Sequence, residues 1–420
     1  MIVFHESNES PRAAEERGSP ESEANMTTTK PQSNALHRRT LLGVAGLAAA
    51  LVALSLPGCK EKPAAAPALA PAGPVVKIGA ALSLTGAGAP YAAQQKAGIE
   101  AAVAEVNKAG SLGAKLEVLI EDDASSKEQC ITVFQKFINR EKVSAILGPT
   151  LSTQATAADP IAQQEKVPVL AVSNTAPTGI TDIGNYIWRD SLTEGQVIPG
   201  AFKRAKEKLG LKTAAVLYGN DDVFTKAGYD VMAKTLADLQ IQVVETQTFA
   251  KADRDYHAQL TALTSKKPDV LVVSALADAA AAIVSQARQS GWTGPILGGN
   301  GFNSPAFIKN AGPAAEGVLV GTSWNSLSQD PANQAFLKAM AARGASPDQF
   351  SAQAFTGVLI LAEAVRLAGG RTGREDVLAG LGKVKDLPTP LGSFSFTAAR
   401  DAQHEPSVQQ VKDGKFQIVQ

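Results

Sequence analysis

Cysteine and histidine are scarce in this sequence, which has two cysteines and four histidines among 420 residues. Two cysteines cannot build a disulfide scaffold, and no Cys/His cluster or HExxH motif offers ligands for a zinc ion. Cys130 shares one helical face with Phe134, Phe137 and Ile138, at spacings of four, seven and eight residues. We therefore expect Cys130 to be a small buried apolar residue.

The sequence also has no excess of basic or of acidic residues. Basic and acidic residues number 40 each, and no long basic run occurs. A balanced chain has no field that would hold nucleic acid, so we predict no nucleic-acid partner. Aromatic residues make up only 5% of the chain, but hydrophobic residues make up 45%, which is enough for packed cores. The chain is too long for one ordinary core and suits two domains.

Catalytic and cofactor motifs are absent as well. The sequence has no GxxxxGK(S/T) phosphate loop, and Gly321–Asn325 departs from the GxSxG nucleophile elbow at its last position. In the glycine-rich turn after the first strand, Tyr91 stands where a dinucleotide fingerprint needs its third glycine. The distant His257 and His404 are expected on the surface. We therefore predict a protein that is not an enzyme and that binds no metal or cofactor.

The amino-terminal region has the plan of an export signal. Residues 1–25 are polar and acidic, and either Met1 or Met26 is the start. A pair of arginines leads into an apolar run at 41–56, which is shorter than the ~20 residues of a membrane span. The arginines fit twin-arginine export, and an ordinary charged region fits general secretory export, so both routes stay open. We assign residues 1–58 to a leader and export signal.

The export signal ends in Leu56-Pro-Gly-Cys59, which resembles a bacterial lipobox. Cleavage there would make Cys59 the mature start and the site of lipidation. Residues 60–74 are rich in proline and alanine, so they cannot build a core and are expected to form an extended tether. We predict a lipid-anchored protein of the bacterial cell envelope, in the periplasm or on the outer face of the cytoplasmic membrane.

From residue 75 onward, short apolar runs alternate with longer stretches of helical period. Because the runs are continuously apolar, they indicate strands that are covered on both faces. The expected strands are 75–84, 116–120, 145–147, 169–172, 213–218, 270–274 and 317–323. The expected helices are 91–109, 127–140, 153–165, 194–209, 224–239 and 278–290, two of them started by capping boxes at Ser125–Glu128 and Ser191–Glu194. Repeated βα units predict an α/β fold with doubly wound parallel sheets, in two lobes.

Hydroxyl and small residues gather where two successive strands end, at Gly148–Thr153 and at Ser173–Pro177. In open α/β sheets ligands bind beyond the carboxyl ends of strands, and helix amino termini attract anions. Helix capping alone explains either turn taken singly. Two such turns in one lobe favour a ligand site that holds a carboxylate without lysine or arginine.

In their order along the chain, these features resemble the type I periplasmic binding proteins, in particular the leucine/isoleucine/valine-binding branch. The resemblance spans roughly Val76 to Val419 and rests on Lys77–Gly86 followed by Tyr91, Ala145–Pro149 with Ser152–Gln154, Val167–Ala171 with Thr175–Pro177, Gly298–Phe302, and Ala315–Gly321. It implies two doubly wound lobes, 75–190 plus 325–395 and 191–324 plus 396–420. They would be joined by a three-strand hinge near Arg189–Ser191, Ser323–Asn325 and Ser395–Ala399.

The resemblance also implies a ligand site made of Tyr91, Thr150, Ser152, Ser173, Thr175, Phe224, Leu276 and Asn300. The four hydroxyl residues would bind the ligand carboxylate, Tyr91 would face the cleft from the first lobe, and Phe224 would close from the second. Leu276 falls where the family often has another aromatic residue. Asn300 stands where amino-acid binders of this branch place a glutamate that pairs with the ligand ammonium. Either another acid takes over, with Asp222 and Asp278 as candidates, or the ligand is not a plain α-amino acid.

The function that the resemblance implies is the substrate-binding lipoprotein of an ABC importer. It would capture a branched-chain or other neutral amino acid by closing its two lobes, and the closed form would meet the permease subunits. The alternatives are a binder of a different small ligand, such as an amide, urea or an aromatic carboxylate, and a ligand-sensing receptor module. We expect a monomer.

Overall fold

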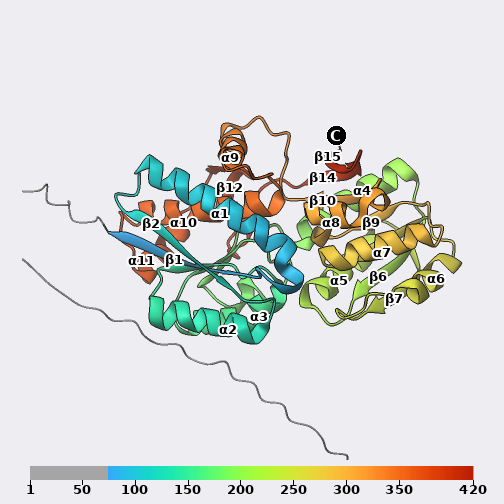
Figure 1. The fold of residues 1–420 in the computed structure, drawn as a ribbon, viewed down its shortest axis with the longest axis horizontal. Coiled ribbons are helices and arrows are strands. Elements are labelled where there is room, and N and C mark those ends of the chain that lie inside the picture. Colours follow the sequence, from blue (N-terminus) through green and yellow to red (C-terminus); the bar gives the residue numbers. More distant parts are fainter. Residues whose placement is uncertain (1–73, 420) are drawn as a thin grey trace, which may run out of the picture. The chain divides into compact units, whose positions relative to one another are not determined.

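A computed structural model of the protein describes residues 74–419, in which strands and helices alternate (Figure 1). The leader and export signal at 1–58, Cys59 and the tether up to residue 73 lie outside the described residues. The strands gather in two large sheets and one small sheet, and most neighbouring strands of the large sheets run parallel. The predicted α/β class with two doubly wound, mostly parallel sheets is confirmed.

The first sheet has five parallel strands in the order β2-β1-β3-β4-β5. They are β1 (Val75–Leu82), β2 (Lys115–Asp122), β3 (Ala145–Leu147), β4 (Val169–Ala171) and β5 (Ile187–Arg189). Helices α1 (Ala89–Ala109) and α10 (Gln349–Leu367) cover one face, and α2 (Lys127–Gln135) and α3 (Ser152–Gln164) cover the other (Figure 1). Both faces are buried because Ile78 and Ala80 pack toward α1 and α10, while Ala81 packs toward Phe134 of α2.

The second sheet has seven strands in the order β15-β14-β10-β9-β8-β6-β7. They are β6 (Thr213–Gly219), β7 (Gln242–Phe249), β8 (Val270–Ser274), β9 (Ile296–Gly298), β10 (Leu319–Thr322), β14 (Ser407–Lys412) and β15 (Lys415–Ile418). Only β14 and β15 run antiparallel to their neighbours. The helices of this part are α4 (Glu194–Leu209), α5 (Val223–Asp238), α6 (His257–Ser265), α7 (Ala277–Gln289) and α8 (Pro305–Ala311).

We call the first sheet with its helices the first lobe and the second sheet with its helices the second lobe. The remaining helices, α9 (Pro331–Ala342) and α11 (Arg374–Leu381), pack in the first lobe with α1 and α10. Helix α10 is long and apolar enough to cross a membrane by composition, but most of it is buried inside the protein. It is therefore a core helix, and its first turn reaches the border between the lobes.

The small sheet corrects the expected position of the third passage between the lobes. It contains β11 (Leu387–Thr389), β12 (Gly392–Phe396) and β13 (Ala402–Gln403), and Ser395 pairs with Gln403. The chain therefore turns back after β12 and joins the second sheet only at Ser407. The passage expected near Ser395–Ala399 lies too early, because this stretch forms the turn of a hairpin.

Two predicted capping boxes are also displaced. Ser125 donates its hydroxyl to the Thr85 carbonyl, and Ser126 caps α2 instead. Ser191 donates to the Asn174 carbonyl, and the cap of α4 is Thr193, whose N–H donates to the side chain of Gln196, three residues later. The spacing of the residues predicted where both helices begin. The two expected serines do not cap them, because their hydroxyls donate to carbonyls of neighbouring loops.

Cys130 and the two histidines give a mixed result. Cys130 is fully buried, as predicted, and burial raises the pKa of its thiol. His257 is exposed, as predicted. His404 is half-buried rather than exposed: both its ring nitrogens are sealed from solvent, and burial lowers its pKa to about 4.

Candidate functional site

The carboxyl ends of the strands locate the candidate site. Strands β2-β1-β3-β4-β5 and β7-β6-β8-β9-β10 have the same order, so the strand order reverses beside β1 and beside β6. Ligands of open α/β sheets bind beyond the carboxyl ends of strands at such reversals. A cavity of about 20 Å³ is lined from both lobes by Tyr91, Thr150, Leu151, Ser152, Ser173, Thr175, Phe224, Leu276, Asn300, Gly301 and Phe350.

All eight residues that the sequence assigned to the ligand site line this one cavity. Five come from the first lobe, on α1 or just after β3 and β4, and three come from the second lobe, just after β6, β8 and β9. Leu151, Gly301 and Phe350, the last in the first turn of α10, also line the cavity and were not predicted. The structure thus brings the predicted set together, and its role in binding stays a prediction.

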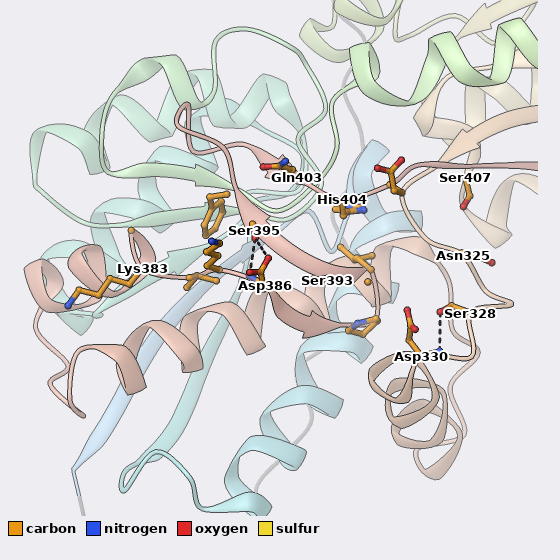
Figure 2. A pocket seen from close by; sticks show the side chains of 18 residues that line it. Asn325, Ser328, Asp330, Lys383, Asp386, Ser393, Ser395, Gln403, His404 and Ser407 are labelled. Carbon is orange, nitrogen blue, oxygen red and sulfur yellow. Dashed lines mark hydrogen bonds between the residues drawn. The ribbon is translucent and has the colours of Figure 1, made fainter.

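A larger cavity of about 810 Å³ lies elsewhere (Figure 2). It is lined by residues between 325 and 330, 382 and 396, and 403 and 407, and it includes none of the eight expected residues. Its polar groups partly hold one another, since the Asp386 N–H donates to the Ser395 hydroxyl and the Asp330 N–H to the Ser328 hydroxyl. Only its residues 325–330 follow a parallel strand, β10, and the others lie in or beside the small sheet. The smaller cavity, where the ends of several parallel strands of both lobes meet, is therefore the better candidate.

A buried glutamine organises the hydroxyl groups of the first lobe. Gln95, one helical turn after Tyr91 on α1, accepts from the Thr150 hydroxyl at 2.7 Å and donates to the Ser173 hydroxyl at 2.8 Å. Ser173 in turn donates to the Thr150 carbonyl, and the Ser83 N–H donates to the Thr150 hydroxyl. These two hydroxyls are therefore fully engaged, and they shape the cavity wall.

The start of α3 carries the donors that remain free. The N–H groups of Ser152 and Thr153 have no acceptor among residues 74–419, as is usual for the first turn of a helix. The Ser152 hydroxyl accepts only a long contact of 3.5 Å from the Ala176 N–H, so its own proton is free. Orphan amides, a hydroxyl and the positive end of a helix dipole together favour an anion here.

Apolar side chains form the rest of the wall and meet across the two lobes. Tyr91, Phe224, Leu276 and Phe350 pack in one small cluster, and the rings of Tyr91 and Phe350 are 4.6 Å apart. The Tyr91 hydroxyl accepts from the N–H of Ala277 at 2.6 Å and donates to a carbonyl of the second lobe at 3.0 Å. Tyr91 therefore ties the first lobe directly to the second.

Replacing Tyr91 with phenylalanine should loosen this tie. The change removes both hydrogen bonds across the lobes, which contribute about 1–2 kcal/mol together. We expect the Ala277 amide, which loses its acceptor, to exchange its hydrogen roughly 5–30 times faster. The Ala280 amide is the control, because it bonds within its own helix to Leu276. Equal protection of Ala277 in both proteins, measured by hydrogen exchange, would contradict the role of Tyr91.

One carboxylate that the sequence did not single out lies beside the cavity. Glu194 is completely buried at the start of α4, and its Oε1 accepts from the Asn300 N–H at 3.1 Å and the Thr175 hydroxyl at 3.3 Å. Its Oε2 has no partner and is sealed from solvent. Burial raises the pKa of Glu194 to about 7, so the group holds its proton about half of the time at neutral pH.

The two acids proposed from sequence do not reach the cavity. Asp222 caps α5 and accepts from the Thr153 hydroxyl of the first lobe at 2.7 Å. Asp278, in the first turn of α7, accepts from the Asn310 side chain. Both line a neighbouring cavity of about 340 Å³ at the border of the lobes. Their expected role as replacements for a glutamate at position 300 is not supported.

The comparisons with known proteins agree with this geometry. A family model described as periplasmic binding protein matches residues 75–415. A leucine-, isoleucine-, valine-, threonine- and alanine-binding protein of Pseudomonas aeruginosa is 30% identical over 78% of this chain and 87% of its own length. A leucine-binding protein of Thermotoga maritima superposes with a TM-score of 0.78 at 27% identity, covering 82% of this chain and 98% of that one. A branched-chain amino acid transporter substrate-binding protein of Streptococcus pneumoniae, solved with isoleucine, gives 0.76 at 27% identity, covering 82% and 99%.

Proposed function

The chain belongs to the periplasmic binding protein family, and on that premise we propose that it is the solute-binding component of an ABC importer, which captures a small carboxylate-bearing ligand between its lobes. The family is a solute-binding class, and it implies a periplasmic or extracellular location. The observation that carries the proposal is that one cavity, lined from both lobes beyond the carboxyl ends of parallel strands, brings together all eight residues expected at the ligand site.

The carboxylate of the proposed ligand would bind at the start of α3. There the free amides of Ser152 and Thr153 and the Ser152 hydroxyl supply donors, and Thr175 lies in the turn that follows β4. The apolar body of the ligand would contact Phe224, Leu276 and the other apolar side chains of the cavity. Because these contacts come from both lobes, a bound ligand stabilises the closed arrangement.

We propose a ligand of amino-acid size. The similar proteins are named for branched-chain amino acids, which supports a neutral amino acid or a close analogue of one. The alternatives are an amide, urea or an aromatic carboxylate. The cavity of about 20 Å³ has room for little more than water, so the lobes have to part to admit any of these ligands.

The family and the leader expected from the sequence support a proposal for the partners and the location. We propose that ABC permease subunits receive the closed protein, that it acts as a monomer, and that Cys59 carries a lipid anchor in the cell envelope. Mass spectrometry of the protein from membranes tests the anchor, since a Cys59→Ser variant should lose the added lipid mass and leave the membrane fraction.

A ligand panel tests the proposed function. Amino acids, amides, urea and aromatic or branched-chain acids are added to the folded mature protein, and thermal unfolding is followed. A true ligand at a hundred times its dissociation constant should stabilise the fold by about 2.7 kcal/mol. The binding of that ligand should weaken in Ser152→Ala and in Thr175→Ala, and it should not change in the control Ser265→Ala, whose side chain is exposed. The absence of binding by every carboxylate, or unchanged affinity in both cavity variants, would overturn the proposal.

A further inference from the structure

The orientation of one side-chain amide decides what the second lobe recognises. Asn300 lines the cavity, and its amide has an oxygen that accepts hydrogen bonds and a nitrogen that donates them. An oxygen that faced the ligand would suit an ammonium group, and a nitrogen would suit an acceptor oxygen. The buried neighbours of Asn300 determine which atom faces the cavity.

A backbone amide fixes the first neighbour. The N–H of Ser323 lies 2.8 Å from the Gln349 side chain, and a backbone N–H only donates, so the atom that it meets is Oε1. The other amide atom of Gln349 is therefore Nε2, a donor. This Nε2 lies 2.8 Å from the side chain of Asn300, so the Asn300 atom that accepts its hydrogen bond is the oxygen, Oδ1.

A backbone carbonyl fixes the second neighbour independently. The Gly321 carbonyl only accepts, so the Asn303 atom 2.8 Å from it is the donor Nδ2. The same Nδ2 lies 2.8 Å from Asn300 Oδ1. The opposite atom of Asn303, Oδ1, accepts from Gln409 at 2.7 Å. Two unrelated backbone groups thus lead to one orientation of Asn300.

The Asn300 nitrogen is consequently left for the ligand. Its oxygen accepts from both Gln349 and Asn303, whereas Nδ2 has no partner within the part of the chain that the structure describes. Nδ2 is not among the unpartnered polar atoms sealed from solvent, but Glu194 Oε2 is. The second lobe therefore offers the cavity a hydrogen-bond donor and no free carboxylate.

We infer that the site selects a carboxylic acid whose second polar group is a hydrogen-bond acceptor, such as a 2-hydroxy acid, a 2-oxo acid or a dicarboxylate, over the corresponding α-amino acid. The carboxylate meets the donors at the start of α3, and the second oxygen meets Asn300 Nδ2. An ammonium group has donors only, so it would face another donor in a desolvated cavity without a partner. The inference rests on the proposed function, because it presumes that a carboxylic acid binds in this cavity.

Gln349 and Asn303 act here as positioning residues. Gln349 opens α10 of the first lobe, and it also accepts from the Thr322 hydroxyl at 2.8 Å, where the chain leaves β10. The side chain that orients Asn300 thus also contacts the passage between the lobes. The recognition of the ligand by Asn300 and the closure of the lobes therefore depend on the same buried hydrogen bonds of Gln349.

Matched trios of ligands test the inference on the wild-type mature protein. Each trio keeps the carbon skeleton and exchanges the 2-ammonium for a 2-hydroxyl or a 2-oxo group, as in alanine, lactate and pyruvate, or leucine, 2-hydroxy-4-methylpentanoate and 4-methyl-2-oxopentanoate. We expect the hydroxy or oxo acid of the best-bound trio to bind roughly tenfold tighter or more than the amino acid by calorimetry. Equal or tighter binding of the amino acid overturns the inference and leaves the proposed function standing. If no member of any trio and no other carboxylate binds, the proposed function itself fails.

Two variants check the residues. Asn300→Asp keeps an oxygen toward Gln349 and Asn303 and turns a second oxygen toward the cavity, so the preference should swing by roughly tenfold or more toward the amino acid. Gln349→Glu no longer donates to Asn300 and should shift the preference in the same direction. The matched control is Asn139→Asp, an exposed residue outside the cavity, which should leave all ratios unchanged. Ratios that do not move in a folded Asn300→Asp or Gln349→Glu protein would overturn the role of the network.

Discussion

Replacing Arg189 with methionine is expected to destabilise the protein by about 3–5 kcal/mol, because it leaves a charged partner and two carbonyls without their donor. Arg189 ends β5 and is completely buried. Its guanidinium donates to Asp401 at 2.6 and 2.8 Å and to the carbonyls of Asn174 and Ala176 at 3.1 and 2.6 Å. It therefore holds the turn after β4 to the chain that runs toward the third passage between the lobes.

Urea unfolding at pH 7 measures this loss, and the chain offers a matched control. Arg343 also pairs with an acid, Glu100, at 2.9 Å, but both side chains are well exposed. Such a surface pair contributes only about 0–1 kcal/mol, so Arg343→Met should have little effect. A loss in Arg189→Met no larger than that of Arg343→Met would show that the buried pair is dispensable. In the double variant Arg189→Met/Asp401→Asn, part of the stability should return, since the uncompensated charge is gone.

Much of the body up to residue 290 was predictable because its helices and strands have strong local signals. The helix predicted at 194–209 agrees with α4 at both ends, and the strands predicted at 145–147 and 270–274 agree with β3 and β8. No expected helix covers α10, and the reason is physical. It is buried on nearly all sides, so it lacks the polar face that gives a helix its period in sequence. The cap at Asp348 with Ser351 was the remaining signal for its start.

The site likewise contains residues that the sequence predicted and residues that it did not. Thr150, Ser152, Ser173 and Thr175 could be proposed because the carboxyl ends of neighbouring parallel strands converge. Gln95 was missed, although it lies one helical turn after Tyr91 on the same face of α1. The orientation of Asn300 could not be read from sequence at all, since backbone groups more than twenty residues away determine it.

Glu194 was missed because its position suggested a helix cap. The spacing from Ser191 to Glu194 fits a capping box, but the residue that completes the cap of α4 is Gln196. Glu194 instead turns inward, between Thr175 of the first lobe and Asn300 of the second. Sequence spacing alone does not distinguish an acid that caps a helix from one that is buried between two lobes.

Glu194→Gln is expected to make the protein more stable at alkaline pH and to flatten its pH dependence. Burial raises the pKa of Glu194 from 4.5 to about 7, so between these values the folded state holds a proton that the unfolded state has lost. The stabilisation from this proton is complete below about pH 4.5 and is lost as the pH rises through 7, a change of about 3 kcal/mol. Glutamine keeps the oxygen that Asn300 and Thr175 contact, and it never has to be charged in the buried site.

The measurement is urea unfolding of both proteins from pH 5 to pH 8. Burial also raises the pKa of Asp348 to about 7 and the pKa values of Asp159 and Asp190 well above their usual range. These three groups are the same in both proteins, so the difference between the two pH profiles reports Glu194. We expect Glu194→Gln to exceed the wild type at pH 8 by up to about 3 kcal/mol, with a smaller difference at pH 5. Parallel pH profiles would mean that Glu194 is ionised in the folded protein throughout. A bound amino acid would bring an ammonium near Glu194 and lower its pKa, whereas a bound 2-oxo acid brings no cation, so the same titration with ligand separates the two ligand classes.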